Sequence, residues 1–485
     1  MKNKNALYLT LAISSLLVGC NDTNNSSKTN SSNNYETYYE DVETRASFDK
    51  QNDKNFTQTF ENGIDDNLFY SLEGAWHTNV QGAEHEGMKH RNLFYTNDGK
   101  DDYLAIRALG KYSKNKEDPS KIGLPEGGCI VSKEHLGPGR YEIEMAAMPR
   151  EGGVTAMWTY CTTTGNEATS QNEIDIEIGG TTDGTNFKNM WCTSWTKQTV
   201  KDTDTVDVSD SLYLNDRKIH KYTFDWYTNY GSEGTRHIDW FIDGKLIKQM
   251  EGNVVPEHEM PLWVGVWFPP LWAGNASFEE DYMLIKSISY QAFDSTSQYF
   301  ENCRSNPSYN KVNPSTLSIQ KIDFDKIKNL NQFSNGDMES LDDKSTKDNS
   351  YYGWKVDQAS KGTVELVDGN NSKHGYKLIA SKDTSSKYHG EYLVQEITNA
   401  YEGYKYNLSI DAKKMTSESN GNIEIRYINA GGKTINTITY SIDSLEYKTY
   451  TNVITMPKDS FKLEITITSE DGEVAYDNAS LVFVR

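Results

Sequence analysis

Short segments in which apolar and polar residues alternate recur along this chain, separated by turns rich in Gly, Asn and Asp. No helical period of comparable length competes with them. Successive side chains of an extended strand point to opposite faces, so these segments predict half-buried β-strands and an all-β protein. The clearest are residues 103–108, 141–146, 173–178, 221–226, 237–242 and 262–267.

The chain has 485 residues, more than a typical single domain, so we expect more than one folded unit. A second strand series follows a weakly patterned stretch rich in Asn, Ser and Pro, residues 295–332. We therefore expect two linked β-sandwiches. The predicted segments are a leader at 1–20, a flexible tether at 21–50, a first sandwich at 51–297, a linker at 298–330 and a smaller sandwich at 331–485.

The N-terminal segment is typical of export. Lys2 and Lys4 precede an apolar run, 6–18, which is too short to span a bilayer but fits a secretory signal. Residues 17–20 resemble a bacterial lipobox, which implies lipidation of Cys20. We expect an exported protein anchored by lipid in the bacterial envelope, at the outer membrane, the cell surface or the periplasmic face. The alternative is an ordinary signal peptide in which Cys20 has no role.

The charge balance limits the partners. The chain carries 70 acidic and 49 basic side chains, a formal net charge of -21. Phosphate binding depends on Lys and Arg, so nucleic acid is not an expected partner, and sulfated polymers are disfavoured. The 10 Trp and 31 Tyr residues suit sugar faces as well as protein cores. We expect a monomer that binds a β-linked polysaccharide or a host glycan.

The cysteines after the leader are Cys129, Cys161, Cys192 and Cys303, and none belongs to a CxxC motif. This spacing indicates neither a zinc site nor a dense disulfide framework. One or two disulfides and buried free thiols both remain open. We expect no cofactor, although Asp477 and acidic loop residues leave a structural calcium ion open.

The segment most informative about chemistry is residues 172–180. Glu173, Asp175 and Glu177 alternate with three Ile residues, which places the carboxylates on one strand face. Like charges in such proximity raise at least one pKa. The Cα atoms of Glu173 and Glu177 should lie about 13 Å apart. Their long side chains can bring the two carboxyl groups near the ~5–5.5 Å separation that retaining glycoside hydrolysis requires. A solvated strand edge or a calcium-ligand cluster are the simpler interpretations.

The residues around this segment resemble glycoside hydrolase family 16, whose signature is Glu-x-Asp-x-Glu or a bulged version one residue longer. Further similarity lies in residues 139–144, 152–158, 220–226, 238–244, 267–269, 272–274 and 281–283. The resemblance implies a concanavalin-like jelly-roll sandwich with a concave sheet. It also implies Glu173 as nucleophile, Asp175 as the assisting carboxyl and Glu177 as general acid/base. The short spacing is similar to the unbulged, lichenase-like form of the strand.

The resemblance also suggests substrate-binding residues and a substrate. Trp158, Trp195 and Trp267 are candidates to stack on sugar rings, and His220 is a candidate cleft residue. Segments 158–160 and 192–195 look similar to endo-β-1,4-galactosidases acting on poly-N-acetyllactosamine or mucin-type glycans. A β-1,3-1,4- or β-1,3-glucanase is the alternative, and a non-catalytic surface glycan-binding protein or a transglycosylase also stays open.

Residues 331–485 resemble carbohydrate-binding modules of the family 4 and 22 type, through segments 333–339, 353–354 and 475–481. This resemblance implies a second jelly roll that holds the glycan near the cleft. Trp354, Tyr404 and Tyr427 are its aromatic candidates. A sandwich that serves only as a spacer is the alternative.

Overall fold

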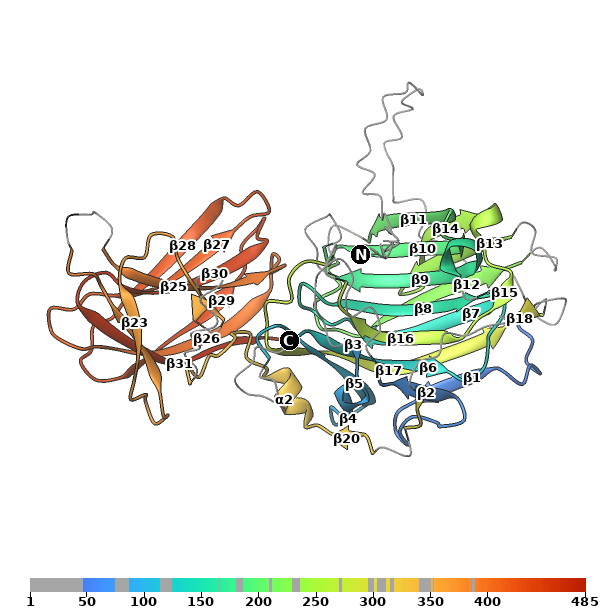
Figure 1. The fold of residues 1–485 in the computed structure, drawn as a ribbon, viewed down its shortest axis with the longest axis horizontal. Coiled ribbons are helices and arrows are strands. Elements are labelled where there is room, and N and C mark those ends of the chain that lie inside the picture. The colour runs from blue at the N-terminus through green and yellow to red at the C-terminus, as the bar shows by residue number, and fades with distance from the viewer. Residues whose placement is uncertain are drawn as a thin grey trace, which may run out of the picture. The chain divides into compact units, whose positions relative to one another are not determined.

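The computed structural model describes residues 47–74, 87–113, 124–164, 166–179, 186–208, 212–228, 236–269, 273–294, 301–302, 311–314, 318–339, 350–351, 353–383, 385 and 389–485. The chain divides into two compact units, residues 1–38 and 39–485. The first unit, with the predicted leader and Cys20, lies outside the described residues, as does Cys303. Both predicted sandwiches belong to the second unit, and nearly all of its elements are strands (Figure 1).

The first sandwich has two layers of mainly antiparallel strands. In hydrogen-bonded order, one layer contains β19 (Lys311–Val312), β2 (Phe69–Leu72), β6 (Glu126–Ser132), β16 (Leu262–Trp267), β8 (Val154–Thr162), β9 (Gln171–Gly179), β10 (Asn189–Lys197) and β11 (Val200–Asp207). The other contains β14 (Lys245–Glu251), β13 (His237–Ile242), β12 (His220–Tyr227), β7 (Gly139–Ala146), β17 (Glu280–Ala292), then β1 (Phe56–Thr59) and β5 (Asp102–Leu109) on β17, β4 (Leu93–Asn97) and β20 (Gln320–Lys321). Shorter elements are β3 (Gly87–Met88), β15 (His258–Glu259), β18 (Glu301–Asn302), α1 (Glu167–Ser170), α2 (Phe324–Lys328), η2 (His90–Asn92) and η3 (Gly252–Val254).

Apolar residues at alternate positions of both layers form one core. Ile143 on β7 and Phe224 on β12 are fully buried, and so is Ile176 on β9 in the opposite layer. The rings of Tyr141 and Phe224 stack at 4.5 Å between centroids. The observed architecture confirms the predicted all-β jelly-roll class. Each strand buries one apolar face, and two layers that pack these faces together form a sandwich.

The second sandwich has two separate sheets around its own core. One contains β21 (Ser350–Tyr351), β22 (Trp354–Val356), β25 (Glu391–Thr398), β30 (Lys462–Ser469), β27 (Asn422–Ile428) and β28 (Thr434–Ser441). The other contains β23 (Thr363–Val367), β24 (Gly375–Ile379), β31 (Glu473–Phe483), β26 (Lys405–Lys414) and β29 (Lys448–Thr455). Trp354 and Tyr427 are buried in this core, and Tyr404 packs on Tyr213 and Tyr401. None of the three aromatic candidates is therefore an open platform for a sugar.

The segment predicted as a linker is packed against the first sandwich rather than extended between domains. Its strands β19 and β20 pair with β2 and β4. In α2, Asp323 caps the helix by accepting a hydrogen bond of 3.0 Å from the Asp325 N–H, and Ile327 is buried. The first sandwich also begins before residue 51, since Phe48 pairs with Phe293.

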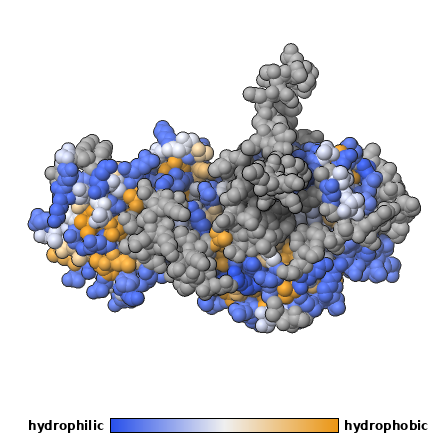
Figure 2. Space-filling view, viewed as in Figure 1, coloured by the Kyte–Doolittle hydropathy of each residue, from blue (hydrophilic) through white to orange (hydrophobic). Residues whose placement is uncertain are grey.

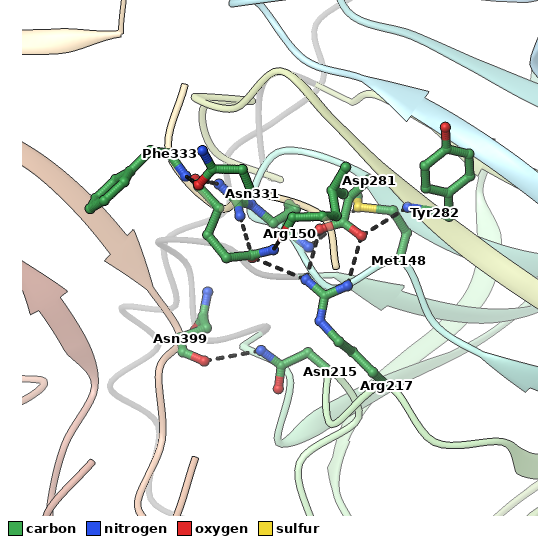
Figure 3. A network of polar contacts seen from close by, with 11 residues as sticks. Met148, Arg150, Asn215, Arg217, Asp281, Tyr282, Asn331, Phe333 and Asn399 are labelled. Atoms are coloured by element: carbon green, nitrogen blue, oxygen red, sulfur yellow. Dashed lines mark hydrogen bonds and ion pairs between the residues drawn. The ribbon is translucent and has the colours of Figure 1, made fainter. Parts of the chain in front are cut away.

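A buried ionic network joins residues on either side of this linker (Figure 3). Arg217 donates to both carboxylate oxygens of Asp281 at 2.9 and 2.8 Å, and both side chains are buried. The side-chain oxygen of Gln332 accepts from Arg217 at 3.0 Å and from Arg150 at 2.5 Å. Gln332, at the start of the second sandwich, thus accepts hydrogen bonds from two arginines of the first.

Hydrophilic residues predominate over the coloured part of the face shown in Figure 2. The large apolar side chains that are clearly exposed in the described ranges all belong to the second sandwich. None of the described helices combines the length and the apolar character required to cross a bilayer.

Candidate active site

Strand β9 carries the three carboxylates predicted as catalytic, and it lies between β8 and β10 with regular pairing on both sides. Ile174, Ile176 and Ile178 are fully buried in the core between the layers. The intervening side chains therefore project from the opposite face of the sheet, as the alternation predicts. The pairings show no register shift along β9, in agreement with the unbulged form.

The carboxylates lie in a cleft of about 420 Å³ on this face. The cleft side chains form rows that run across the strands, because residues paired on neighbouring strands share a face of the sheet. Glu173 is paired with Tyr160 and Trp195, and Glu177 is paired with Trp191. The lining residues are Trp158, Tyr160, Gln171, Glu173, Asp175, Glu177, Trp191, Thr193, Trp195, Gln198, Lys201, Thr203 and Trp267.

Asp175, in the middle of the three, is the most deeply buried, with 4 % of its surface exposed. Burial raises the pKa of this carboxyl well above its usual range, and the charges of Glu173 and Glu177 raise it further. A hydrogen bond from Asp175 to Glu173 acts in the same direction, while one from Trp195 opposes it. These shifts favour the protonated form of Asp175, which can then donate a hydrogen bond to Glu173.

Glu177 and Glu173 are each partly exposed to the cleft. Burial raises the pKa of Glu177 to about 7, and a hydrogen bond with Trp267 limits the rise. A carboxyl with this pKa can give up a proton and take one back near neutrality. Glu173, by contrast, accepts a hydrogen bond from the side-chain amide of Gln171. The two outer carboxyls thus stand in different environments, one suited to proton transfer and one held by donors.

The three tryptophans predicted to bind sugar all line this cleft. Trp158 is 4 % exposed and stacks on Trp263 at 5.6 Å, so it forms the floor more than a free platform. One face of Trp195 is covered by the Lys201 ammonium group, 4.5 Å from the ring centroid. The indole N–H groups of Trp195 and Trp267 engage Asp175 and Glu177, so both rings also contact the carboxyls.

His220 is not among the cleft residues, which corrects the expectation that it contacts substrate. It begins β12, in the other layer of the sandwich. Its Nδ1 lies 2.8 Å from Asp243 and its Nε2 lies 3.3 Å from Asp216. Burial opposes the charged ring, but hydrogen bonds with Asp216 and Asp243 raise the pKa of His220 to about 9. These contacts give His220 a structural role, bracing the start of its strand.

Several cleft residues were missed, some of them although the alternation of their strand indicates the cleft face. Trp191 and Thr193 belong to the same alternation as Trp195 on β10, which would have placed them on the cleft face. Lys201 and Thr203 lie on β11, where nearly every residue is polar, so no burial pattern marks a face. Gln171 lies two residues before Glu173, within the alternation already recognised.

The other candidates from the sequence were a calcium site near Asp477 and the cysteines. Within the described ranges, no group of three or more His, Cys, Asp or Glu side chains is arranged to hold a metal ion. Asp477 accepts hydrogen bonds from the Asn370 N–H at 2.6 Å and from the Ser372 hydroxyl at 2.5 Å. Cys129 and Cys192 are buried free thiols, whereas Cys161 is disulfide-bonded.

Residues 88–283 match the family described as "Glycosyl hydrolases family 16". A protein of Ruminococcus flavefaciens named "Xylanase/beta-glucanase" is 26 % identical over 153 residues, which cover 32 % of this chain. The match spans only 17 % of the length of that curated relative.

Solved structures with similarity include the Bacillus licheniformis β-glucanase, with 19 % identity and a TM-score of 0.38 over 49 % of this chain and 97 % of that one. The laminarinase catalytic domain of Thermotoga maritima has 17 % identity and a TM-score of 0.38 over 49 % of this chain and 96 % of that one. The segment matched by the family description includes β9 with all three carboxylates. This chain therefore contains a glycoside hydrolase family 16 domain.

Proposed function

We propose that the family 16 domain is an endo-acting, retaining glycoside hydrolase that cleaves internal β-glycosidic bonds by double displacement. The observation that carries this proposal is the placement of Glu173, Asp175 and Glu177 on one strand in one cleft. Burial raises the pKa of Glu177 to about 7, which suits a general acid, while Gln171 and Asp175 are placed to donate hydrogen bonds to Glu173.

In the first step, a carboxylate oxygen of Glu173 attacks the anomeric carbon while the bond from that carbon to the glycosidic oxygen breaks. Glu177 gives its proton to the departing oxygen, so the leaving sugar departs as a neutral alcohol. Protonated Asp175 donates a hydrogen bond to Glu173 and adds no second negative charge beside it. The product of this step is a covalent glycosyl ester of Glu173.

In the second step, Glu177 acts as a carboxylate and takes a proton from water. The water oxygen attacks the anomeric carbon, the ester bond breaks, and Glu173 is restored as a carboxylate. Two inversions leave the original anomeric configuration. If a sugar hydroxyl takes the place of water, the same ester yields a transglycosylation product.

For the substrate we propose a galactosidic glycan, with the activity of an endo-β-1,4-galactosidase on poly-N-acetyllactosamine or mucin-type chains. The support is the resemblance of segments 158–160 and 192–195, which supply the cleft residues Trp158, Tyr160, Thr193 and Trp195. The alternative is a β-1,3-1,4- or β-1,3-glucan. It is favoured by the name of the curated relative, "Xylanase/beta-glucanase".

The test is incubation of the full chain with mixed-linkage β-glucan, β-1,3-glucan, poly-N-acetyllactosamine and mucin glycans, with products read by mass spectrometry and NMR. Wild type should release oligosaccharides whose new reducing end first appears as the β-anomer. Glu173→Gln should release none while still binding the glycan. Glu251→Gln, at an exposed position on β14, is the matched control and should act like wild type.

Products ending in galactose support the proposed substrate, and products from glucans alone move the assignment to the alternative. Undiminished release by Glu173→Gln would overturn the catalytic proposal. Binding without turnover by wild type on every glycan would instead favour a glycan-binding protein.

We also propose that Cys20 is lipidated and that the second sandwich holds glycan near the cleft; both rest on sequence resemblance. Incorporation of labelled fatty acid into wild type but not into Cys20→Ala tests the anchor.

Affinity electrophoresis of Glu173→Gln, with and without an excess of a short product that fills the cleft, tests a second glycan site. Complete loss of retardation with the short product would leave the second sandwich as a spacer.

A further inference from the structure

Gln171 is a cleft residue that the catalytic scheme above does not use. It opens β9, two residues before Glu173 on the same face, and only 8 % of it is exposed. Its Nε2 donates a hydrogen bond to Oε2 of Glu173. Glu173 thus has a donor on each side along the strand, Gln171 at one end and Asp175 at the other.

The contact with Glu173 fixes which way the amide of Gln171 points. A carboxylate oxygen only accepts hydrogen bonds, so the amide nitrogen must face Glu173 and the carbonyl oxygen must face away. That oxygen, Oε1, is buried and has no hydrogen-bond partner among the described residues. Buried acceptors are seldom left without a hydrogen bond, so we expect a bound ligand to donate one to this oxygen.

We propose that Gln171 both positions the nucleophile and reads the substrate. Through Nε2 it holds Oε2 of Glu173, and through Oε1 it accepts a hydrogen bond from a hydroxyl or acetamido N–H of the sugar bound beside Glu173. This inference rests on the proposed function. It makes Gln171 a positioning residue toward Glu173 and a specificity residue toward the glycan.

A neutral amide suits this position for an electrostatic reason. The cleft already holds the three carboxyl groups of β9, which are spaced two residues apart along the strand. A Glu at position 171 would keep an acceptor of the same length but would place a further negative charge beside Glu173 and remove the donor. The amide supplies a donor to the nucleophile and an acceptor to the substrate with no net charge.

Two substitutions separate these roles. Gln171→Met keeps the length and loses both hydrogen bonds, so kcat/KM should fall about 10- to 100-fold, with a rise in KM as well as a fall in kcat. Gln171→Glu keeps an acceptor but adds charge, so the acidic limb of the pH profile of kcat/KM should move to higher pH. Gln171→Met, which removes the donor without adding a charge, should move this limb in the same direction, whereas loss of a side chain that does not contact Glu173 would not.

The matched control is Gln249→Met. Gln249 on β14 also donates from its side-chain amide to an aspartate, Asp239, at 2.6 Å, but it lies outside the cleft. This variant should keep the wild-type kcat, KM and pH profile. The melting temperature of each variant shows that it is folded.

Folded Gln171 variants with wild-type kcat, KM and acidic limb would overturn this inference and leave the proposed function standing. Absence of turnover by wild type on every glycan would overturn both. A shift of the acidic limb in Gln171→Glu, together with an unchanged profile in Gln249→Met, would support the role of Gln171.

Discussion

The indole Nε1 of Trp240, on β13, donates a hydrogen bond of 3.0 Å to the backbone carbonyl oxygen of Asp175, on β9 in the opposite layer. Trp240 is fully buried, so this bond crosses the core of the sandwich. It ties the backbone of the strand that bears the carboxylates to the layer behind it.

Trp240→Phe should therefore lower both stability and turnover. Loss of a buried hydrogen bond costs about 1–3 kcal/mol in the free energy of unfolding, and the smaller ring adds to this. Freed from this contact, β9 should hold its carboxylates less firmly and kcat should fall. Trp226→Phe is the control, because Trp226 is equally buried but donates to Pro256 instead. Urea unfolding and kcat measure the two effects, and an equal kcat in both variants would contradict this role of Trp240.

Activity should fall as the pH rises through about 7. The first step needs Glu177 protonated, and burial raises the pKa of this group to about 7, so the acid is lost above that value. The basic limb of the pH profile of kcat/KM measures it. Glu177→Gln should abolish this limb, and an aryl glycoside with a good leaving group should lose less activity in that variant. A basic limb that persists in Glu177→Gln would assign the titration to another group.

Asp175→Asn should stabilise the protein at neutral pH. Burial, together with Glu173 and Glu177, raises the pKa of Asp175 above its value in the unfolded chain. The native state therefore binds this proton more tightly than the unfolded state does. The free energy of unfolding falls as the pH rises above the unfolded-state pKa. A pKa raised by one unit costs about 1.4 kcal/mol, and asparagine avoids this cost. Urea unfolding at pH 7 should show the gain and at pH 3 should not, while kcat falls because Asn is a poorer donor.

Asp225→Asn is the contrasting variant. Asp225 is also buried, but Arg140 donates to both of its oxygens at 2.8 Å. Removing that charge leaves the arginine without its partner, so this variant should be less stable. A gain in stability at pH 7 from both substitutions would show that burial alone, without the neighbouring glutamates, governs Asp175.

Arg217→Met should be strongly destabilising. It leaves the carboxylate of Asp281 buried without its charged partner, at a cost of about 3–5 kcal/mol in the free energy of unfolding. The double variant Arg217→Met/Asp281→Leu should recover part of the loss. Lys448→Met removes an exposed ion pair with Asp443 and should leave the unfolding midpoint unchanged. Equal losses in the single and double variants would show that the ionic pairing is not the cause.

The alternation along 173–178 was enough to predict which side chains face the cleft, because a strand of period two leaves no other choice. The cleft role expected for His220 rested on family resemblance and was wrong, whereas its parity with the core residue Tyr222 indicates the other layer of the sandwich. The packing of segment 298–330 on the first sandwich was not predicted, because Ile327 and its apolar neighbours are too sparse to indicate a strand or a long helix. Lys201 was missed because cross-strand pairing, which brings it to Trp195, is absent from the sequence of either strand alone.

All three carboxylates belong to a single strand of nine residues that is hydrogen-bonded on both sides. The distance between nucleophile and acid is therefore fixed by the repeat of the backbone and does not depend on any loop. The other side chains that line the cleft come mainly from β8, β10, β11 and β16. Evolution can accordingly exchange turns or insert residues between these strands to admit a new glycan while the bond-cleaving geometry is inherited unchanged.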